Sequence, residues 1–285
     1  MIKYVLILLG SFVARFLPLR LAYALAETSG RVAYRLFRGR REIVEANLDA
    51  VFPEGLKKSK KEELLKNLFV HIAMNTVDLL RLPYARFPRE RLTVEGLDRL
   101  TELYRDRKGV ILVSPHLGNL EIGGMLLAQA GFTVNVVAES IVSPKTRFRK
   151  DRIAKLYRKY RESVGMKTIP LERSSVAGFR SLKRGEMLVL LSDRDITGSG
   201  VEVEFFGMKS WVPKGPALLA VRTGAPIVFG ICVRCPKGRL KAFVEPLEYR
   251  RDDVEGITRL IVKRMEELIR QYPEQWFVFQ PPWSR

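Results

Sequence analysis

The feature that most constrains the fold is an alternation of short apolar runs with longer amphipathic patterns between residues 110 and 271. The apolar runs are rich in β-branched side chains and predict buried strands, whereas the patterns between them repeat at helical spacing. The expected strands are residues 110–114, 134–138, 187–191, 201–206, 227–233 and 240–244, and the expected helices are residues 120–130, 145–164, 176–183, 216–222 and 254–271. This alternation predicts an α/β fold with a mixed, largely parallel central sheet flanked by helices.

The N-terminal hundred residues are expected to be helical, with helices at residues 41–52 and 57–82. Before them, residues 4–14 form an unbroken run of small or apolar side chains, which is followed by Arg15 and Arg20. Eleven helical residues extend about 16 Å, well short of the ~30 Å hydrocarbon core, so the segment spans a bilayer only if these arginines reach an interface. A cleaved signal peptide and an ordinary core helix are alternatives.

Charge favours a membrane-associating helix at residues 1–40, followed by one α/β domain at residues 41–285. The first 41 residues contain eight Lys and Arg against one acid, and the whole chain carries a net charge of +19. An apolar helix with a cationic flank is typical of an interfacial anchor on an anionic leaflet. Nucleic acid is the rival anionic partner, but no aromatic stacking array or recognised binding motif supports it. Two Cys and two His make a disulfide scaffold or a zinc site unexpected.

A histidine at a strand end is the leading candidate for chemistry. His116 follows the strand 110–114 directly, and open α/β sheets place their sites at such carboxyl ends. Glu121 follows five residues later on the next helix, from which it could orient the imidazole as a general base. Gly118 and Asn119 open that helix, where their N–H groups could face an oxyanion, although capping is the simpler role for Asn119. A structural histidine is the alternative interpretation.

Two further groups are candidate substrate-binding residues. Asp193, Arg194 and Asp195 follow the strand 187–191, so they also lie at a strand end and could bind an acceptor or support the histidine. Residues 145–162 carry nine Lys and Arg against two acids, and the arginines singled out there are Arg147, Arg149 and Arg152. Such density suggests docking of anionic phosphates, whereas a solvated helix face is the ordinary interpretation.

Four blocks in chain order resemble the bacterial lipid A biosynthesis acyltransferases, a lauroyl and myristoyl type within the glycerolipid acyltransferases. SPHLGNLEIGG, at residues 114–124, is similar to their His-x-x-x-x-Asp/Glu block. The other blocks are Arg41 with residues 47–48 and 51–53, residues 192–195 with 200–207, and residues 213–217 with 223–226. Residues 137–140 lack the usual Arg-Pro of the lipid A enzymes, and there the chain looks closer to the phosphatidylinositol mannoside acyltransferase branch.

The resemblance implies acyl transfer from an acyl thioester, carried by coenzyme A or acyl carrier protein, to a glycolipid hydroxyl. It implies His116 as the base and Glu121 as its partner, with no metal and no cofactor. It also implies a monomer on the cytoplasmic face of the bacterial inner membrane, held peripherally or by one N-terminal anchor among anionic lipids. A phosphatidylinositol mannoside or lysophospholipid acceptor is the alternative, and a non-catalytic basic protein binding membranes or nucleic acid is the alternative of a different class.

Overall fold

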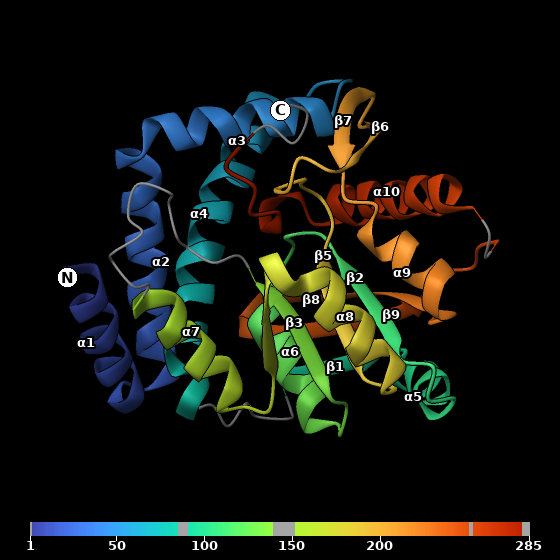
Figure 1. Cartoon of the computed structure of the whole chain (residues 1–285). Helices are drawn as coiled ribbons and strands as arrows, with labels where there is room; N and C mark the ends of the chain where they lie inside the picture. Colours follow the sequence, from blue (N-terminus) through green and yellow to red (C-terminus); the bar gives the residue numbers. More distant parts are fainter. Residues whose placement is uncertain (1, 85–90, 139–151, 251–252, 281–285) are drawn as a thin grey trace.

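The computed structural model describes residues 2–84, 91–138, 152–250 and 253–280. Its centre is a sheet of seven strands in the order β1-β9-β8-β2-β5-β3-β4, beside a two-stranded hairpin of β6 and β7 (Figure 1). The strands are β1 (Leu92–Glu95), β2 (Val110–Ser114), β3 (Val134–Ala138), β4 (Lys167–Pro170), β5 (Met187–Leu191), β6 (Val201–Phe205), β7 (Met208–Val212), β8 (Ile227–Cys235) and β9 (Arg239–Pro246). All neighbours in the large sheet are parallel except β8 and β9, so the predicted largely parallel sheet is confirmed.

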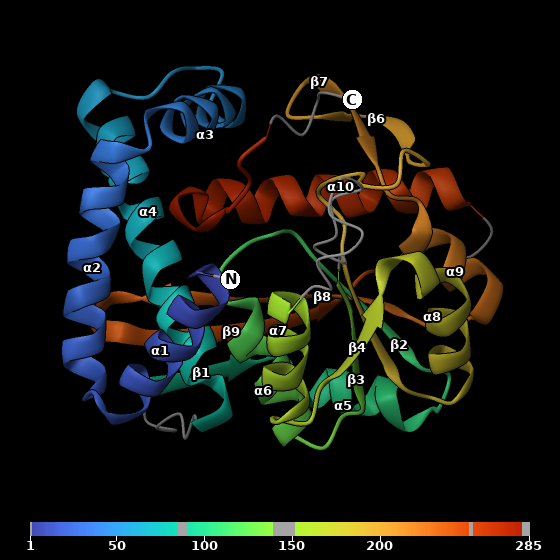
Figure 2. The ribbon, with the colours of Figure 1, turned by 60° about the vertical axis from the view of Figure 1, so that its left-hand side comes forward.

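Helices cover both faces of the sheet and build an N-terminal layer beside it (Figures 1 and 2). They are α1 (Ile2–Phe16), α2 (Leu19–Leu36), α3 (Arg38–Val51), α4 (Lys58–Arg81), α5 (Leu97–Arg105), α6 (Leu120–Gln129), α7 (Arg152–Glu162), α8 (Ser174–Lys183), α9 (Gly215–Thr223) and α10 (Val254–Gln271). Short 3-10 turns occur at Leu82–Tyr84, Leu171–Arg173, Pro236–Gly238 and Pro273–Gln275. The helices expected at 57–82, 120–130 and 254–271 agree with α4, α6 and α10 to within a residue.

The alternation of side chains along the strands divides the core into two layers. Val110 and Leu112 of β2 face the layer that includes Ile122 of α6 and Leu156 of α7. Ile111 and Val113 face the opposite layer, which contains side chains of α8, α9 and α10. Successive strand residues point to opposite faces, so a strand that is apolar on both sides must be covered on both sides. This explains why the central runs are continuously apolar rather than alternating.

The segment at residues 201–206 departs from the expected architecture. It was predicted as a strand of the central sheet, but β6 pairs only with β7, antiparallel, in the separate hairpin. Phe205 is buried there and its ring lies 6.2 Å from that of Trp276, so the hairpin still packs on the core. Strands β1, β4 and β7 were not expected, because each contains exposed positions and none forms a continuous apolar run.

The N-terminal segment contains two helices, α1 and α2, separated at Leu17 and Pro18. Helix α2 lies along α4, and the two approach closely because a Cβ on Gly30 would stand 2.6 Å from the Cα of Val70 (Figure 2). Helix α1 also packs on α4, where Ser11 donates a hydrogen bond of 2.7 Å to the Leu80 carbonyl. Within the described chain no helix combines the length and apolar character needed to cross a bilayer. The division at residue 40 stays a prediction.

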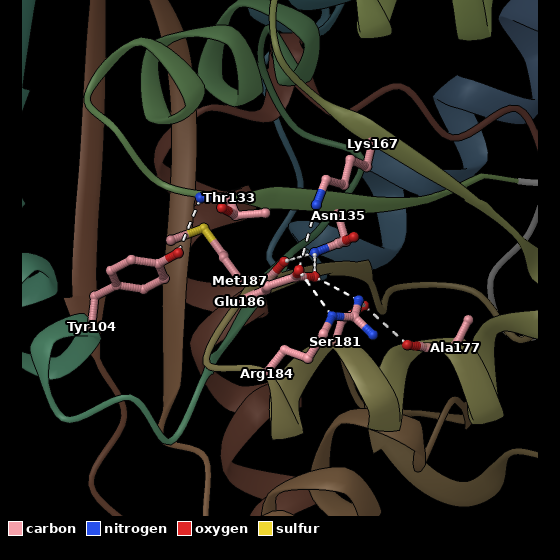
Figure 3. Close-up of polar contacts among 9 residues, drawn as sticks. All are labelled: Tyr104, Thr133, Asn135, Lys167, Ala177, Ser181, Arg184, Glu186 and Met187. Carbon is pink, nitrogen blue, oxygen red and sulfur yellow. Dashed lines mark hydrogen bonds and ion pairs between the residues drawn. The ribbon is translucent and has the colours of Figure 1, made fainter.

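The amino-terminal ends of β3 and β5 carry a compact polar cluster around Glu186 (Figure 3). Arg184 donates to both carboxylate oxygens at 3.0 and 2.8 Å, and Asn135 donates to one of them at 3.0 Å. The Lys167 ammonium lies 3.4 Å from the carboxylate, and these contacts hold the pKa of Glu186 at about 2 although burial acts in the opposite direction. The Glu186 carboxylate therefore connects Asn135 of β3, Lys167 of β4 and Arg184 within the protein.

Candidate active site

The order of the strands brings His116 and Asp193 together. Strands β2 and β5 are parallel neighbours, and Ser114 at the end of one pairs with Leu191 at the end of the other. Each site residue stands two positions beyond its strand end, so both chains deliver their side chains to the same place. Nδ1 of His116 lies 2.6 Å from Oδ1 of Asp193. The predicted site residues at two separate strand ends are therefore in direct contact.

Asp193 is a buried carboxylate with three donors. Besides the imidazole, the backbone N–H of His116 and the indole N–H of Trp276 each donate to Oδ2 at 2.8 Å. Burial alone would raise the pKa of Asp193, but the neighbouring imidazole and these donors outweigh it and lower that pKa below its ordinary value. An ionised carboxylate only accepts hydrogen bonds, so Nδ1 of His116 carries the hydrogen and Nε2 is the basic nitrogen.

The structure gives Glu121 a partner other than the one expected from the sequence. Its oxygens accept hydrogen bonds from the Arg161 guanidinium of α7, at 2.5 Å from Nη2 and 2.9 Å from Nε. Glu121 lies in the first turn of α6, from which its side chain reaches across to α7. His116 and Glu121 line the same cavity, but among the described contacts the imidazole bonds to Asp193 and Glu121 bonds to Arg161. Its catalytic role stays a prediction.

Gly118 and Asn119 form the turn between the histidine and α6. Gly118 has a φ of +73°, and a Cβ there would stand 2.2 Å from the carbonyl oxygen of Cys232, so the turn requires glycine. Its N–H donates to the Gln275 carbonyl at 2.9 Å, and the N–H of Asn119 donates to the Cys232 carbonyl at 2.5 Å. Asn119 also caps α6, because its Oδ1 accepts from the N–H of Ile122. Both N–H groups proposed for an oxyanion are thus engaged within the protein.

The remaining substrate-binding candidates are divided between the cavity, the surface and the undescribed segment. Arg194 and Asp195 line the cavity with His116. Arg152 begins α7 as an exposed residue, and Arg147 and Arg149 lie outside the described residues. The cations of the same segment that line the cavity are Lys155, Arg158 and Arg161, which the sequence did not distinguish from their neighbours.

The cavity in front of the histidine has a volume of about 1700 Å³ and is walled mainly by apolar side chains. One row of its lining crosses one face of the sheet, and other lining residues, such as Leu219 and Phe243, pack against the opposite core layer. Six neighbouring strands contribute to the row, through Val136, Val189, Leu112, Gly230, Ala242 and Val94. Strands lie about 4.8 Å apart, so five steps across this row cover about 24 Å. The volume exceeds the roughly 300–1,000 Å³ of ordinary small-molecule pockets, and its shape suits a long apolar ligand.

Sequence reasoning found both residues of the contact but not the contact itself. Asp193 was selected for its strand-end position, yet its pairing with His116 depends on β2 lying next to β5, which are separated by two strands in the chain. Trp276 was not assigned to the site, and Arg161 was considered only as one of the nine cations of residues 145–162. Trp276 stands 83 residues from Asp193, and no local pattern signals that its indole reaches that carboxylate.

Comparison with known proteins shows which family the chain belongs to. The family model for "Bacterial lipid A biosynthesis acyltransferase" matches residues 1–285. A phosphatidylinositol mannoside acyltransferase of Mycobacterium tuberculosis H37Rv is 32% identical over 67% of this chain, and the match spans 59% of that relative's length. The Mycolicibacterium smegmatis protein of the same name is 30% identical over 78% of this chain and 73% of its own. The lipid A biosynthesis lauroyltransferase of Escherichia coli K12 is 26% identical over 91% and 84%. The chain belongs to the bacterial lipid A biosynthesis acyltransferase family.

Proposed function

We propose that this protein is an O-acyltransferase that moves a fatty acyl chain from an acyl thioester to a hydroxyl group of a glycolipid. The observation that carries the proposal is the buried Asp193 carboxylate, 2.6 Å from Nδ1 of a histidine that lines a large apolar cavity. This geometry fixes the tautomer in which Nε2 of His116 can accept a proton. Family membership supports the same reaction class.

The proposed step is a direct attack without a covalent enzyme intermediate. Nε2 of His116 takes the proton of the acceptor hydroxyl while its oxygen forms a bond to the thioester carbonyl carbon. Asp193 stabilises the imidazolium that results, because its charge lies against Nδ1. Collapse of the tetrahedral intermediate breaks the C–S bond, and the imidazolium returns the proton to the leaving thiolate. The donor thiol belongs to coenzyme A or acyl carrier protein, and the reaction balances without a metal or a further cofactor.

The acyl chain of the donor fits the apolar lining of the cavity. A leaflet of a bilayer is about 15 Å thick in its hydrocarbon part, which is the span of one ordinary acyl chain. From β2 the row extends about 14 Å toward β1 and about 10 Å toward β3, so an extended chain starting near His116 matches the β1 side and exceeds the β3 side. The cations Arg158, Arg194 and Lys214 at the cavity wall provide charge for phosphates of the donor or acceptor.

Two glycolipid acceptors are proposed, each with its own support. The family model is that of the lipid A enzymes, which favours a lipid A precursor. The higher identity, 32%, is with a phosphatidylinositol mannoside acyltransferase, which favours a phosphatidylinositol mannoside. Both acceptors should be offered to the purified protein with the same long-chain acyl-coenzyme A, and the acylated product identified by mass spectrometry. Mass spectrometry of lipids from the host with and without the gene would test the choice in the cell.

We also propose that α1 and α2 hold the protein on the cytoplasmic face of the bacterial inner membrane as a peripheral monomer. One side of these helices packs on α4, while the other exposes a row of large apolar side chains, which are Leu9, Phe12, Phe16, Leu21, Leu25 and Leu36. Exposed apolar area of this kind on a cationic segment suits an anionic lipid surface. Leu25→Glu should weaken co-sedimentation with anionic vesicles, whereas Leu260→Glu, at an exposed leucine of α10, should not. Equal sedimentation of both variants would exclude α2 as the contact.

Turnover by a His116 variant tests the catalytic proposal. His116→Ala should abolish acyl transfer while melting temperature and vesicle binding stay near wild type. The chain contains only one other histidine, His71, which is not among the residues lining the cavity, so His71→Gln is a matched control that should retain transfer. Transfer by His116→Ala at the wild-type rate would refute His116 as the base, whereas absence of transfer by the wild-type protein would favour a non-catalytic membrane-surface protein.

A further inference from the structure

A buried charged cluster contacts the turn that follows His116, and its members are not among the residues that line the cavity. Asp78 of α4 accepts hydrogen bonds from three elements, and its side chain is 2% exposed. Tyr23 of α2 donates to Oδ1 at 2.7 Å, whereas Asn119 of the turn and Arg234 of β8 donate to Oδ2 at 2.6 and 2.5 Å. One carboxylate therefore joins the N-terminal helices, the sheet and the turn that follows His116.

The same cluster also holds the turn through its backbone. Arg234 donates from Nη2 to the Asn75 side chain at 3.1 Å, and Asn75 in turn donates to the Gly118 carbonyl at 2.9 Å. The backbone N–H of Arg234 donates to the side-chain oxygen of Gln275. The backbone carbonyl of Gln275 accepts a hydrogen bond from the N–H of Gly118. Both peptide groups that flank Gly118 are thus fixed by residues connected to the Asp78 cluster.

Stability alone is a poor explanation for this cluster. Buried ion pairs often contribute little net free energy, because desolvation offsets much of the attraction between the charges. Within the described residues, two further nitrogens of Arg234, Nε and Nη1, are buried without a hydrogen-bond partner. The position of the guanidinium therefore does not maximise its own hydrogen bonding. Instead its Nη2 is shared between Asp78 and Asn75, the two groups that lead to the turn. The arrangement is organised around the position of residues 118–119.

We propose that Asp78 is a positioning residue for the acyl transfer, which holds the turn behind His116 and ties it through Tyr23 to helix α2. The proposal rests on the proposed function, since it assigns the turn a catalytic base to position. Asp78 and Tyr23 are not among the residues that line the cavity. Their effect is exerted through Asn119 and Gly118, which connect the base to α6. Helix α2 thereby becomes part of the active-site support as well as the proposed membrane contact.

Tyr23→Phe is the central variant, because it removes only the hydroxyl that joins α2 to Asp78. Ser11→Ala is its matched control. It also removes one hydrogen bond between an N-terminal helix and α4, here a part-buried one, but its acceptor is the Leu80 carbonyl and not a residue bonded to the turn. Asp78→Asn completes the set by removing the charge while keeping the shape. Each full-length variant is compared with wild type for melting temperature, for kcat and KM with a long-chain acyl-coenzyme A, and for hydrogen exchange of the peptide spanning residues 116–122.

We expect Tyr23→Phe and Asp78→Asn to lower kcat by about 10- to 100-fold with little change in the KM of the donor, since a small misplacement of a catalytic group has effects of this size. Amide exchange within residues 116–122 should accelerate in both. Ser11→Ala should shift the melting temperature by an amount similar to Tyr23→Phe, a few degrees at most, with kcat and exchange unchanged.

Equal losses of kcat in Ser11→Ala and Tyr23→Phe would overturn the proposal, because the effect would then follow stability. Wild-type kcat and exchange in Tyr23→Phe would overturn it as well, and this variant remains decisive if Asp78→Asn does not fold. Amide hydrogen exchange of residues 116–122 measures the order of the turn independently of catalytic activity. If the wild-type protein showed no acyl transfer, the proposed function would fail, while the exchange comparison would still judge whether Asp78 and Tyr23 hold the turn.

Discussion

Asp193→Asn should reduce kcat by a large factor while leaving the fold intact. The Asp193 side chain is fully buried and lies 2.6 Å from Nδ1 of His116, so its charge acts on the imidazolium with little screening by water. Two opposite charges about 4 Å apart interact by about 4 kcal/mol at an effective dielectric constant of about 20. Because each 1.36 kcal/mol changes a rate about tenfold, removal of the charge should lower kcat by about 10³-fold. Asn keeps the size of the side chain, so the loss reflects charge and tautomer rather than packing.

Release of free thiol from a long-chain acyl-coenzyme A in the presence of the acceptor measures this loss. Trp276→Phe is a graded control, because it removes one donor to Oδ2 and leaves the bond between Asp193 and the imidazole in place. It should cost no more than about tenfold, in line with the loss of one hydrogen bond. In a His116→Ala background, Asp193→Asn should produce no further loss. A kcat of Asp193→Asn within tenfold of wild type would refute the assignment of Asp193 as the group that supports the base.

Three further predictions concern the other carboxylate of the cavity and the response of the fold to acid. Glu121→Gln should lower kcat less than Asp193→Asn in the thiol assay, because Arg161 already binds the Glu121 carboxylate. A larger loss in Glu121→Gln would identify Glu121 as the carboxylate that supports the base. Glu186 has a pKa of about 2 against an ordinary 4.5, so its stabilisation is present above pH 4.5 and is lost as the pH falls toward 2. Since Arg184 and Lys167 are exposed, Glu186→Gln should cost about 1–2 kcal/mol in guanidinium unfolding at pH 6 and almost nothing near pH 2. Burial and the charge of Arg234 lower the pKa of His71 from 6.5 to about 4, so the fold should lose stability between pH 6.5 and 4, and His71→Gln should flatten the melting temperature over that interval.

The strand-end positions of the candidate site residues were largely predictable, because they depend on local patterns. Continuous β-branched runs such as residues 110–114 form strands that are covered on both faces, and the proline after Ser114 ends the strand just before His116. The same reasoning placed Asp193 at another strand end. Each inference needed only the residues within one strand and the turn that follows it.

The partners of these residues were decided by the tertiary structure. His116 meets Asp193 because β2 and β5 are neighbours in register, although β3 and β4 lie between them in the chain. Spacing along the sequence favoured Glu121 instead, yet α6 directs that side chain to Arg161 of α7. Hydrogen bonds between distant segments depend on the order of strands and the packing of helices, and the periodicity of a single segment carries no information about either.

For the N-terminal helices, too, the sequence predicted the general character and the tertiary structure decided the contacts. Their apolar character and positive charge are properties of the sequence and sufficed to suggest a lipid surface. That one side of α2 is buried on α4, and that Tyr23 on this side reaches Asp78 beneath the catalytic turn, required the packed structure. A helix has a continuous surface, and only its neighbours determine which side of it is buried and which faces a membrane.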